Sequence, residues 1–362
     1  MFYREAGQFK ASYAEDNQIF PIRQDRFVIA FIIAFAFLGV PLLAQLGLVS
    51  NYMFTAILTP FLIFALAALG LNILTGYAGQ LSLGTAAFMA VGAFASYNFM
   101  LRIDGMPILL AFILGGLCAA AVGIVFGLPS LRIRGFYLAA ATLATQFFIV
   151  WCLTKVGWFT NYSSSGVITA QQIAVLGYAF DSSMSKYLFV LGVVSVMALL
   201  AKNMVRTNIG RSWMAIRDMD MAAEVIGFRP MRTKLMAFAV SSFYCGVAGA
   251  LFAYAYLGTV EPDGFNLELS FRILFMVIIG GLGSVLGSFL GSAFIVLLPI
   301  VLNVGMQSLE SAGLPLPSGI GSSIELMAFG ALIIFFLIVE PHGLARLWQI
   351  AKEKLRLWPF PH

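Results

Sequence analysis

Long uncharged stretches constrain the fold of this chain more than any other feature. No Lys, Arg, Asp or Glu occurs between Phe27 and Leu101, or within residues 135–154, 187–201, 235–260 and 273–309. The 362 residues are 61% hydrophobic and 10% charged, whereas soluble domains are roughly 45–50% apolar. A soluble core of this length cannot bury so much apolar surface, but lipid can cover it. The sequence therefore predicts an all-α polytopic membrane protein.

Nine apolar runs are long enough to cross a bilayer. They lie at 27–49, 52–75, 79–101, 107–129, 135–154, 187–201, 235–258, 270–303 and 324–340. One crossing needs about 20 residues, so the 34 residues of 270–303 are too many for one simple crossing. The sequence GGLGS at Gly280–Ser284 predicts a break there, because glycine loosens the helix backbone. We therefore expect about ten segments, some of them broken or re-entrant.

Basic residues gather in four places between or beside these runs. They are the polar head at 1–26, the SLRIRG loop, the segment 202–234 and the tail at 346–362. Ten crossings with both termini inside place all four in the cytoplasm, as the positive-inside rule requires. This pattern explains the net charge of +5 without a nucleic-acid partner. We divide the chain into a cytoplasmic head (1–26), a membrane domain (27–345) and a cytoplasmic tail (346–362).

The sequence lacks the residues that several kinds of chemistry require. No G-x-x-x-x-G-K-S/T motif occurs, so the chain does not bind a nucleotide through a P-loop, and we expect no enzyme activity. His342 and His362 both lie in the tail region, so we expect no metal site or cofactor. Ion-coupled carriers place ionisable groups within the membrane, but only Arg272, Glu325 and Glu340 come close, each near the end of a run. Glu325 fits either an interface position or a path residue.

Two segments rich in small residues stand out within the membrane region. The first, GYAGQLSLGTAAFMAVGAFAS, contains Gly79, Ser82 and Gly84; the second, GGLGSVLGSFLGSAF, contains Gly283, Ser284, Gly287 and Ser288. Glycine and serine at every fourth residue are typical of tight helix packing. Broken helices that flank a translocation path, as in many transporters, are the alternative.

The segment 202–234 holds seven of the 21 basic residues and three of the 16 acidic ones. Its pattern predicts one helix of about 14 residues from Trp213 to Ile226, ended by Gly227 and Pro230. A helix lying on the membrane surface is one interpretation. The mixed charge around Arg217 and the small face formed by Ala222, Ala223 and Gly227 favour docking to another protein instead.

Four motifs in order resemble one known family. LGLNILTGYAGQLSLGTAAFMAVGAF, GLPSLRIRGFYLAAATLA, the AIRD…AA…G…KLMAF segment from Ala215 to Phe238, and GGLGSVLGSFLGSAF are similar to motifs of LivM-type permeases, and VEPHGL near the end also fits. These permeases belong to the ABC importers of branched-chain amino acids. The resemblance covers about residues 55–345.

This resemblance implies a permease subunit in the bacterial inner membrane. Its expected partners are a LivH-like second permease, two ATPase subunits (LivG- and LivF-like) that bind ATP and Mg²⁺, a periplasmic solute-binding protein and membrane lipid. The 202–234 loop would hold the coupling helix that contacts an ATPase. The positions that carry this motif are Arg217, Asp218, Ala222, Ala223 and Gly227, whereas Met221 replaces the glutamate found in many importers.

An uncharged path suits a small solute with an apolar side chain, so branched-chain or other hydrophobic amino acids are the expected cargo. Relatives that carry urea, short amides or aromatic acids are the alternative within this importer type. Two further alternatives are an ion-coupled secondary carrier and a membrane scaffold that transports nothing.

Overall fold

The computed structural model describes residues 23–47, 50–130, 136–163, 166–175, 177–311 and 343–357, with Ser12 and some residues between 327 and 340. Glu325, part of the predicted span at 324–340 and most of the head therefore lie outside the described residues. The helices in chain order are α2 (Arg23–Ala34), α3 (Val40–Gln45), α4 (Thr59–Asn72), α5 (Thr85–Arg102), α6 (Ile108–Ser130), α7 (Phe136–Lys155), α8 (Ser183–Arg206), α9 (Asn208–Asp218), α10 (Asp220–Val225), α11 (Pro230–Leu251), α12 (Leu267–Gly280), α13 (Val285–Ser311) and α15 (Leu344–Leu357).

Short π-helical turns extend several of these helices. They are η1 (Phe35–Gly39), η2 (Met53–Leu58), η3 (Ile73–Tyr77) and η4 (Phe252–Leu257), and a 3₁₀ turn, η5, covers Pro262–Phe265. Four strands of two residues form two antiparallel pairs: β1 (Ile168–Thr169) with β4 (Thr259–Val260), and β2 (Ala174–Val175) with β3 (Tyr178–Ala179). The prediction of an all-α protein is therefore confirmed.

Seven helical segments among the described residues are long and apolar enough to cross a membrane. They are Arg26–Gln45, Met53–Tyr77, Ile108–Pro129, Tyr137–Lys155, Ser183–Arg206, Pro230–Leu257 and Val285–Met306. Helices α5 and α12 are shorter, with 18 and 14 residues. The chain is thus a multi-pass membrane protein.

Both glycine-rich segments separate two helical segments: the break at Gly280–Ser284 was predicted, whereas the one before α5 corresponds to the alternative of broken helices. The run 270–303 breaks between Gly280, where α12 ends, and Val285, where α13 begins. Gly281 has φ of 115° there, a backbone conformation that residues with a Cβ rarely adopt. Residues 79–84 likewise separate the turn η3 from α5. The two breaks lie in opposite halves of the sequence.

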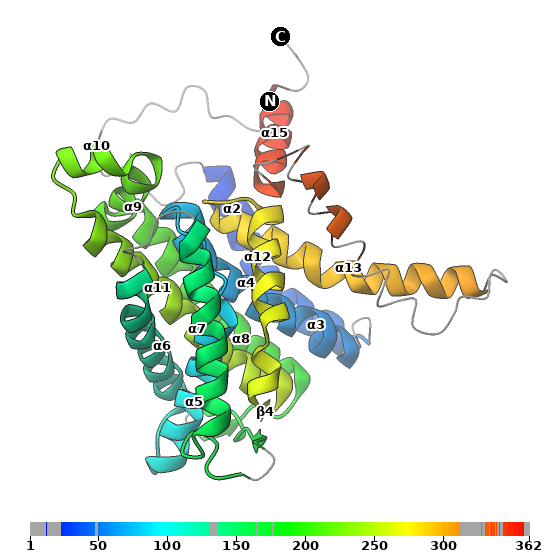
Figure 1. Cartoon of the computed structure of the whole chain (residues 1–362). Helices are drawn as coiled ribbons and strands as arrows, with labels where there is room; N and C mark the ends of the chain where they lie inside the picture. The colour runs from blue at the N-terminus through cyan, green and yellow to red at the C-terminus, as the bar shows by residue number, and fades with distance from the viewer. Residues whose placement is uncertain are drawn as a thin grey trace.

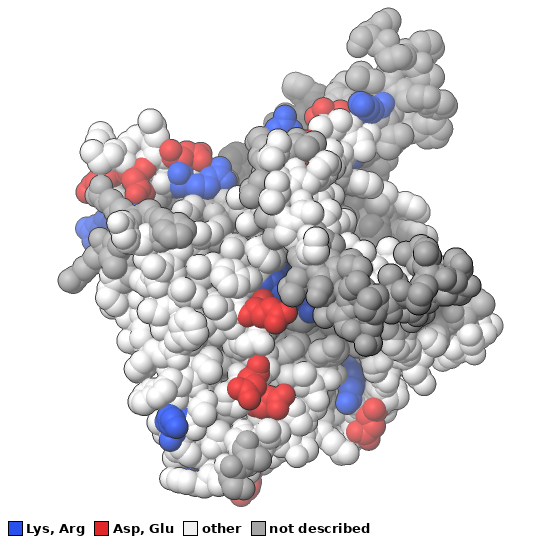
Figure 2. All heavy atoms as spheres, turned by 45° about the vertical axis from the view of Figure 1, so that its right-hand side comes forward, with Lys and Arg blue, Asp and Glu red and all other residues white. Residues whose placement is uncertain are grey.

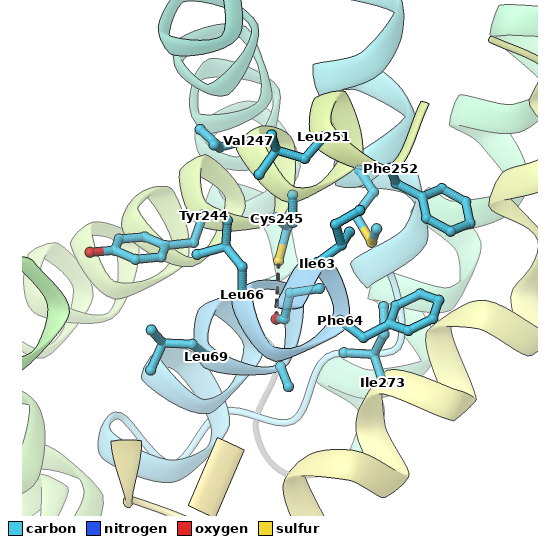
Figure 3. Close-up of a cluster of buried hydrophobic side chains, with 14 of the residues drawn as sticks. Ile63, Phe64, Leu66, Leu69, Tyr244, Cys245, Val247, Leu251, Phe252 and Ile273 are labelled. Carbon is cyan, nitrogen blue, oxygen red and sulfur yellow. Dashed lines mark hydrogen bonds between the residues drawn. The ribbon is translucent and has the colours of Figure 1, made fainter. Parts of the chain in front are cut away.

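Helix α4 lies at the centre of the molecule, between α11 on one side and α12 and α13 on the other (Figure 1). Every residue of α4 except Phe61 is buried. Figure 3 shows Leu66 and Leu69 of α4 facing Tyr244 and Cys245 of α11, where the Cys245 thiol lies 4.0 Å from the carbonyl oxygen of Ala67. Because α4 is enclosed by protein, its ends can hold polar side chains away from lipid.

Glycines let the neighbouring helices approach closely. A Cβ on Gly92 of α5 would collide with the carbonyl oxygen of Gly246 of α11, and one on Gly249 of α11 would collide with that of Met89. On α6, a Cβ on Gly116 would lie 2.9 Å from a methyl group of Val247. Small residues at helix contacts are the usual basis of association in lipid, where no hydrophobic driving force joins helices.

The two ends of the bundle differ. Helices α9, α10 and α15 lie at one end, at the top of Figure 1, and β4 lies at the other. Figure 2 shows most of the visible charge near these ends, with a smaller group of both signs on the middle of the face. The predicted 202–234 loop is therefore placed at one end of the bundle, away from the β-strands.

Candidate functional site

Asn72, the last residue of α4, joins the two glycine-rich segments. Its side chain is fully buried. The amide nitrogen donates to the carbonyl oxygen of Ser284 at 2.8 Å and to the hydroxyl of Ser288 at 2.9 Å, and the amide oxygen accepts from the backbone N–H of Gly283 at 2.8 Å. One side chain thus provides an acceptor for the N–H of Gly283 within the break and binds the first turn of α13 as well.

Arg217 of α9 reaches the same place from the 202–234 loop. Its Nη1 donates to the carbonyl oxygen of Gly76 at 2.8 Å. A Cβ on Gly79 would lie 2.8 Å from Cγ of Arg217, and one on Gly283 would lie 3.3 Å from Nη1. The guanidinium group therefore contacts both glycine-rich segments. We call Asn72, Gly76, Arg217 and Gly283 the junction.

The structure divides the predicted path residues among three environments. Gly79, Gly283, Ser284 and Ser288 lie at the junction. Gly84 packs against α7 instead, since a Cβ there would lie 2.8 Å from the carbonyl oxygen of Thr142. The buried hydroxyl of Ser82 accepts from the N–H of Gly84 at 3.4 Å. Gly287 faces α12, where its Cβ would lie 2.7 Å from the carbonyl oxygen of Gly280.

The start of α5 is held by side chains that the sequence did not indicate. The N–H of Ala86 donates to Ser270 of α12 at 2.9 Å, and that of Ala87 donates to Oε1 of Gln146 of α7 at 2.6 Å. The amide nitrogen of Gln146 donates in turn to the carbonyl oxygen of Phe265 at 2.8 Å. These side chains cap a helix that begins inside the protein, where water is not available to do so.

The predicted single helix from Trp213 to Ile226 is wrong. Helix α9 ends at Asp218, Met219 has an extended backbone (φ −154°, ψ 96°), and α10 begins at Asp220. The carboxylate of Asp220 pairs with Lys234 at the start of α11. This ion pair holds α10 against α11, so the chain turns at Met219 instead of continuing as one helix.

The predicted face of small residues on this loop does not form one surface. Ala222 is exposed, but Ala223 is 2% exposed and faces the protein. Gly227 has φ of 103° and ends α10, and the N–H of Phe228 beyond it donates to the carbonyl oxygen of Ala223 at 3.0 Å. Asp218 binds the guanidinium of Arg217 at 2.9 Å and is itself exposed.

Large apolar side chains cover the outer face of the loop. We call this set the loop patch: Met219, Met221, Val225, Ile226 and Phe228. Val225 is the most exposed of them, at 89%. Exposed apolar side chains gathered in one place, with charged neighbours, are typical of a surface that binds another protein.

The charged residues of the membrane region are placed as follows. Arg272 lies in the second turn of α12, with its guanidinium 5.5 Å from the ring centre of Phe64. Glu340 pairs with Arg346 at 3.7 Å. Beside this pair, a Cβ on Gly343 would lie 2.6 Å from the backbone nitrogen of Gly281. Gly343 of the VEPHGL motif therefore packs against the break between α12 and α13.

A helical membrane bundle with interrupted helices that contact each other is an arrangement found in many membrane transport proteins. Comparison with known proteins gives the family: the profile of "Branched-chain amino acid transport system / permease component" matches residues 53–337. The chain belongs to this family of permease subunits.

Three relatives illustrate the similarity. The high-affinity branched-chain amino acid transport system permease protein LivM of Salmonella typhimurium is 29% identical, over 80% of this chain and 69% of the relative. LivM of Escherichia coli is 28% identical, over 78% and 68%. The probable branched-chain amino acid transport permease protein LivM of Methanocaldococcus jannaschii is 24% identical, over 80% and 92%. No solved structure gives a significant match to the chain.

Proposed function

We propose that this permease forms half of the translocation path of an ATP-driven importer for branched-chain or other hydrophobic amino acids. Its family membership and the printed names of its relatives support this cargo. The second half of the path is a homologous, LivH-like permease. Two LivG- and LivF-like ATPase subunits bind ATP and Mg²⁺, and a periplasmic binding protein delivers the solute.

The loop patch is the proposed docking surface for an ATPase subunit. Val225 and Ile226 project from α10, while the pair of Asp220 with Lys234 and the buried Ala223 fix α10 to the rest of the chain. A movement of the ATPase would therefore move α10 together with α9, which carries Arg217. In this role Ala223 and Gly227 shape the helix, and Met221 and Val225 make the contact.

The contacts of Arg217 are the observation that supports the proposal most directly. It is the part of the loop that hydrogen-bonds to Gly76 and lies against Gly79 and Gly283. Because these glycines belong to the two interrupted helices, displacement of Arg217 acts on both breaks at once. We propose that this contact transmits ATP binding and hydrolysis to the membrane segments.

The same proposal gives the orientation of the chain in the membrane. An ATPase acts in the cytoplasm, so α9, α10 and α15, which share one end of the bundle (Figure 1), face the cytoplasm, and β4 faces the periplasm. About ten segments with both termini cytoplasmic agree with this placement. The division into a head, a membrane domain and a tail remains a prediction.

The test replaces Arg217 by Gln in the importer assembled with its partners. The variant loses the charged hydrogen bond to Gly76, so we expect ATP hydrolysis stimulated by the loaded binding protein to fall about tenfold. Arg211→Gln is the matched control: Arg211 lies on the same helix, is exposed, and among the described residues its side chain bonds to Asn208 at 2.7 Å, one turn away. Normal stimulation and leucine uptake in Arg217→Gln would contradict the proposed coupling route.

A further inference from the structure

A cavity of about 330 Å³ lies between α4, α12, α13 and the turns η2 and η4. Its lining includes Phe64, Phe252, Tyr256, Glu268 and Arg272. At roughly 30 Å³ for each water-sized group, this volume suits a solute of about ten non-hydrogen atoms. Tyr256 is 44% exposed, so the cavity opens at the surface of the chain. Its size matches the smallest class of ligand sites, which begins near 300 Å³.

Two opposite charges line this cavity from one helix. Glu268 and Arg272 are four residues apart on α12, so their side chains emerge on the same face with about 5–6 Å between the Cβ atoms. Within the described part of the chain neither side chain forms an ion pair. Nε of Arg272 is buried and has no hydrogen-bond partner there. A buried donor of this kind is costly unless a ligand satisfies it.

Aromatic rings form an apolar wall of the cavity beside Arg272. The rings of Phe64 and Phe252 lie 5.6 Å apart, and those of Phe252 and Tyr256 stack at 5.4 Å. Figure 3 shows Phe64 and Phe252 on the same side of α4, near Ile273 of α12. The cavity therefore combines a cation, an anion and an apolar surface.

From this arrangement we propose that the cavity is a subsite for the zwitterion of an apolar α-amino acid. Arg272 binds the carboxylate, Glu268 attracts the ammonium group, and the side chain packs against Phe64 and Phe252. A guanidinium matches a carboxylate in geometry and charge. Binding of the ammonium and carboxylate groups at this subsite is the chemistry by which the importer would recognise its cargo. This inference rests on the proposed function.

The cavity and the junction share two helices. Eight residues separate Arg272 from Gly280 at the end of α12, and eight separate Phe64 from Asn72 at the end of α4. Each distance is about 12 Å along the helix axis at 1.5 Å per residue. A change at the junction therefore displaces the two helices that hold the charged and the aromatic sides of the subsite.

The test uses the assembled importer in proteoliposomes, with uptake of radiolabelled L-leucine and ATP hydrolysis measured in parallel. We expect Arg272→Gln to lower leucine uptake about tenfold or more, while hydrolysis stimulated by the loaded binding protein is retained. Arg102→Gln is the matched control, because Arg102 also lies over an aromatic ring, Trp158 at 3.8 Å, but does not line the cavity. Arg272→Lys keeps the positive charge and should retain part of the uptake.

Specificity for the zwitterion is measured by competition for leucine binding to the importer in detergent. We expect 4-methylpentanoate, which lacks the ammonium group, and isoamylamine, which lacks the carboxylate, to compete at least tenfold less well than leucine. Glu268→Gln, at an exposed position, should remove the preference over 4-methylpentanoate. Normal leucine uptake by Arg272→Gln would overturn the subsite alone. Absence of ATP-driven leucine uptake by the wild-type importer would contradict the proposed function as well.

Discussion

Replacement of Asn72 by Ala tests whether the junction holds the two interrupted helices together. The side chain makes three hydrogen bonds, two as donor to Ser284 and Ser288 and one as acceptor from Gly283. Side-chain hydrogen bonds contribute about 1 kcal/mol each in soluble proteins and about 0.6 kcal/mol each in membrane proteins. The free energy of unfolding should therefore fall by about 2–3 kcal/mol.

Asn98→Ala provides a matched control. Asn98 is also a buried asparagine with three hydrogen bonds, donating to Phe94 and Phe159 and accepting from Arg102. Arg102 ends α5, one helix length from the break that precedes α5, so Asn98 does not contact the junction. We expect similar destabilisation from both variants, but loss of coupling only from Asn72→Ala.

Two measurements separate these effects. Reversible unfolding in bicelles gives the change in stability, and ATP hydrolysis stimulated by the loaded binding protein gives the coupling. A change in unfolding free energy below about 0.5 kcal/mol for Asn72→Ala, the range of ordinary surface substitutions, would refute the structural argument. Equal stimulation of ATP hydrolysis in the two variants would refute the functional argument that the junction couples the loop to the membrane segments.

Two further predictions use exposed and buried positions of the same elements. Val225→Glu changes a side chain that is 89% exposed, so the free energy of unfolding should change by no more than about 0.5 kcal/mol. Copurification with the ATPase subunits should nevertheless be lost. Copurification equal to that of Arg211→Gln would count against the loop patch as the docking surface. Gly291→Leu should destabilise the chain by about 1–3 kcal/mol, because a Cβ there collides with the carbonyl oxygen of Met276. Gly305→Leu on the same helix, where nothing lies within 4 Å of the added Cβ, should unfold like the wild type.

The sequence predicted the features that depend on local pattern and length. The uncharged runs predicted a multi-pass helical protein, and the 34-residue run with its Gly280–Ser284 sequence predicted the break between α12 and α13. The need for glycine at the break is local, because the backbone at Gly281 has φ of 115°, which residues with a Cβ rarely adopt. Such signals can be read without knowing which distant residue lies opposite.

Features that depend on distant partners were missed. Asn72 was part of a quoted motif, but its role depends on Gly283 and Ser284, more than 200 residues away. The break at Met219 depends on the pair of Asp220 with Lys234, which the helical periodicity did not reveal. An isolated asparagine in an apolar run was the one available signal, because a buried amide in a membrane needs partners for its donors and acceptor.

Arg272 lies further inside its helix than the apolar run indicates. The apolar run begins at residue 270, which placed Arg272 at the end of a span. Helix α12 begins earlier, at Leu267, because the side chain of Asn266 caps it by accepting from the N–H of Leu269 at 3.0 Å. Arg272 therefore lies in the second turn of the helix, where it lines the cavity.

The positions of the charged residues support one route from loop to solute. Arg217 contacts the break in each half of the chain, and Asn72 ties those breaks to each other. The helices that end there, α4 and α12, carry Phe64 and Arg272 about 12 Å away. Any displacement of Arg217 must strain or break the bond to Gly76, and the strain acts on both helices because Asn72 joins them. The proposed coupling of the loop to the cavity would run through these two helices, and its physical basis would be a two-state element at the junction that both the loop and the solute bias.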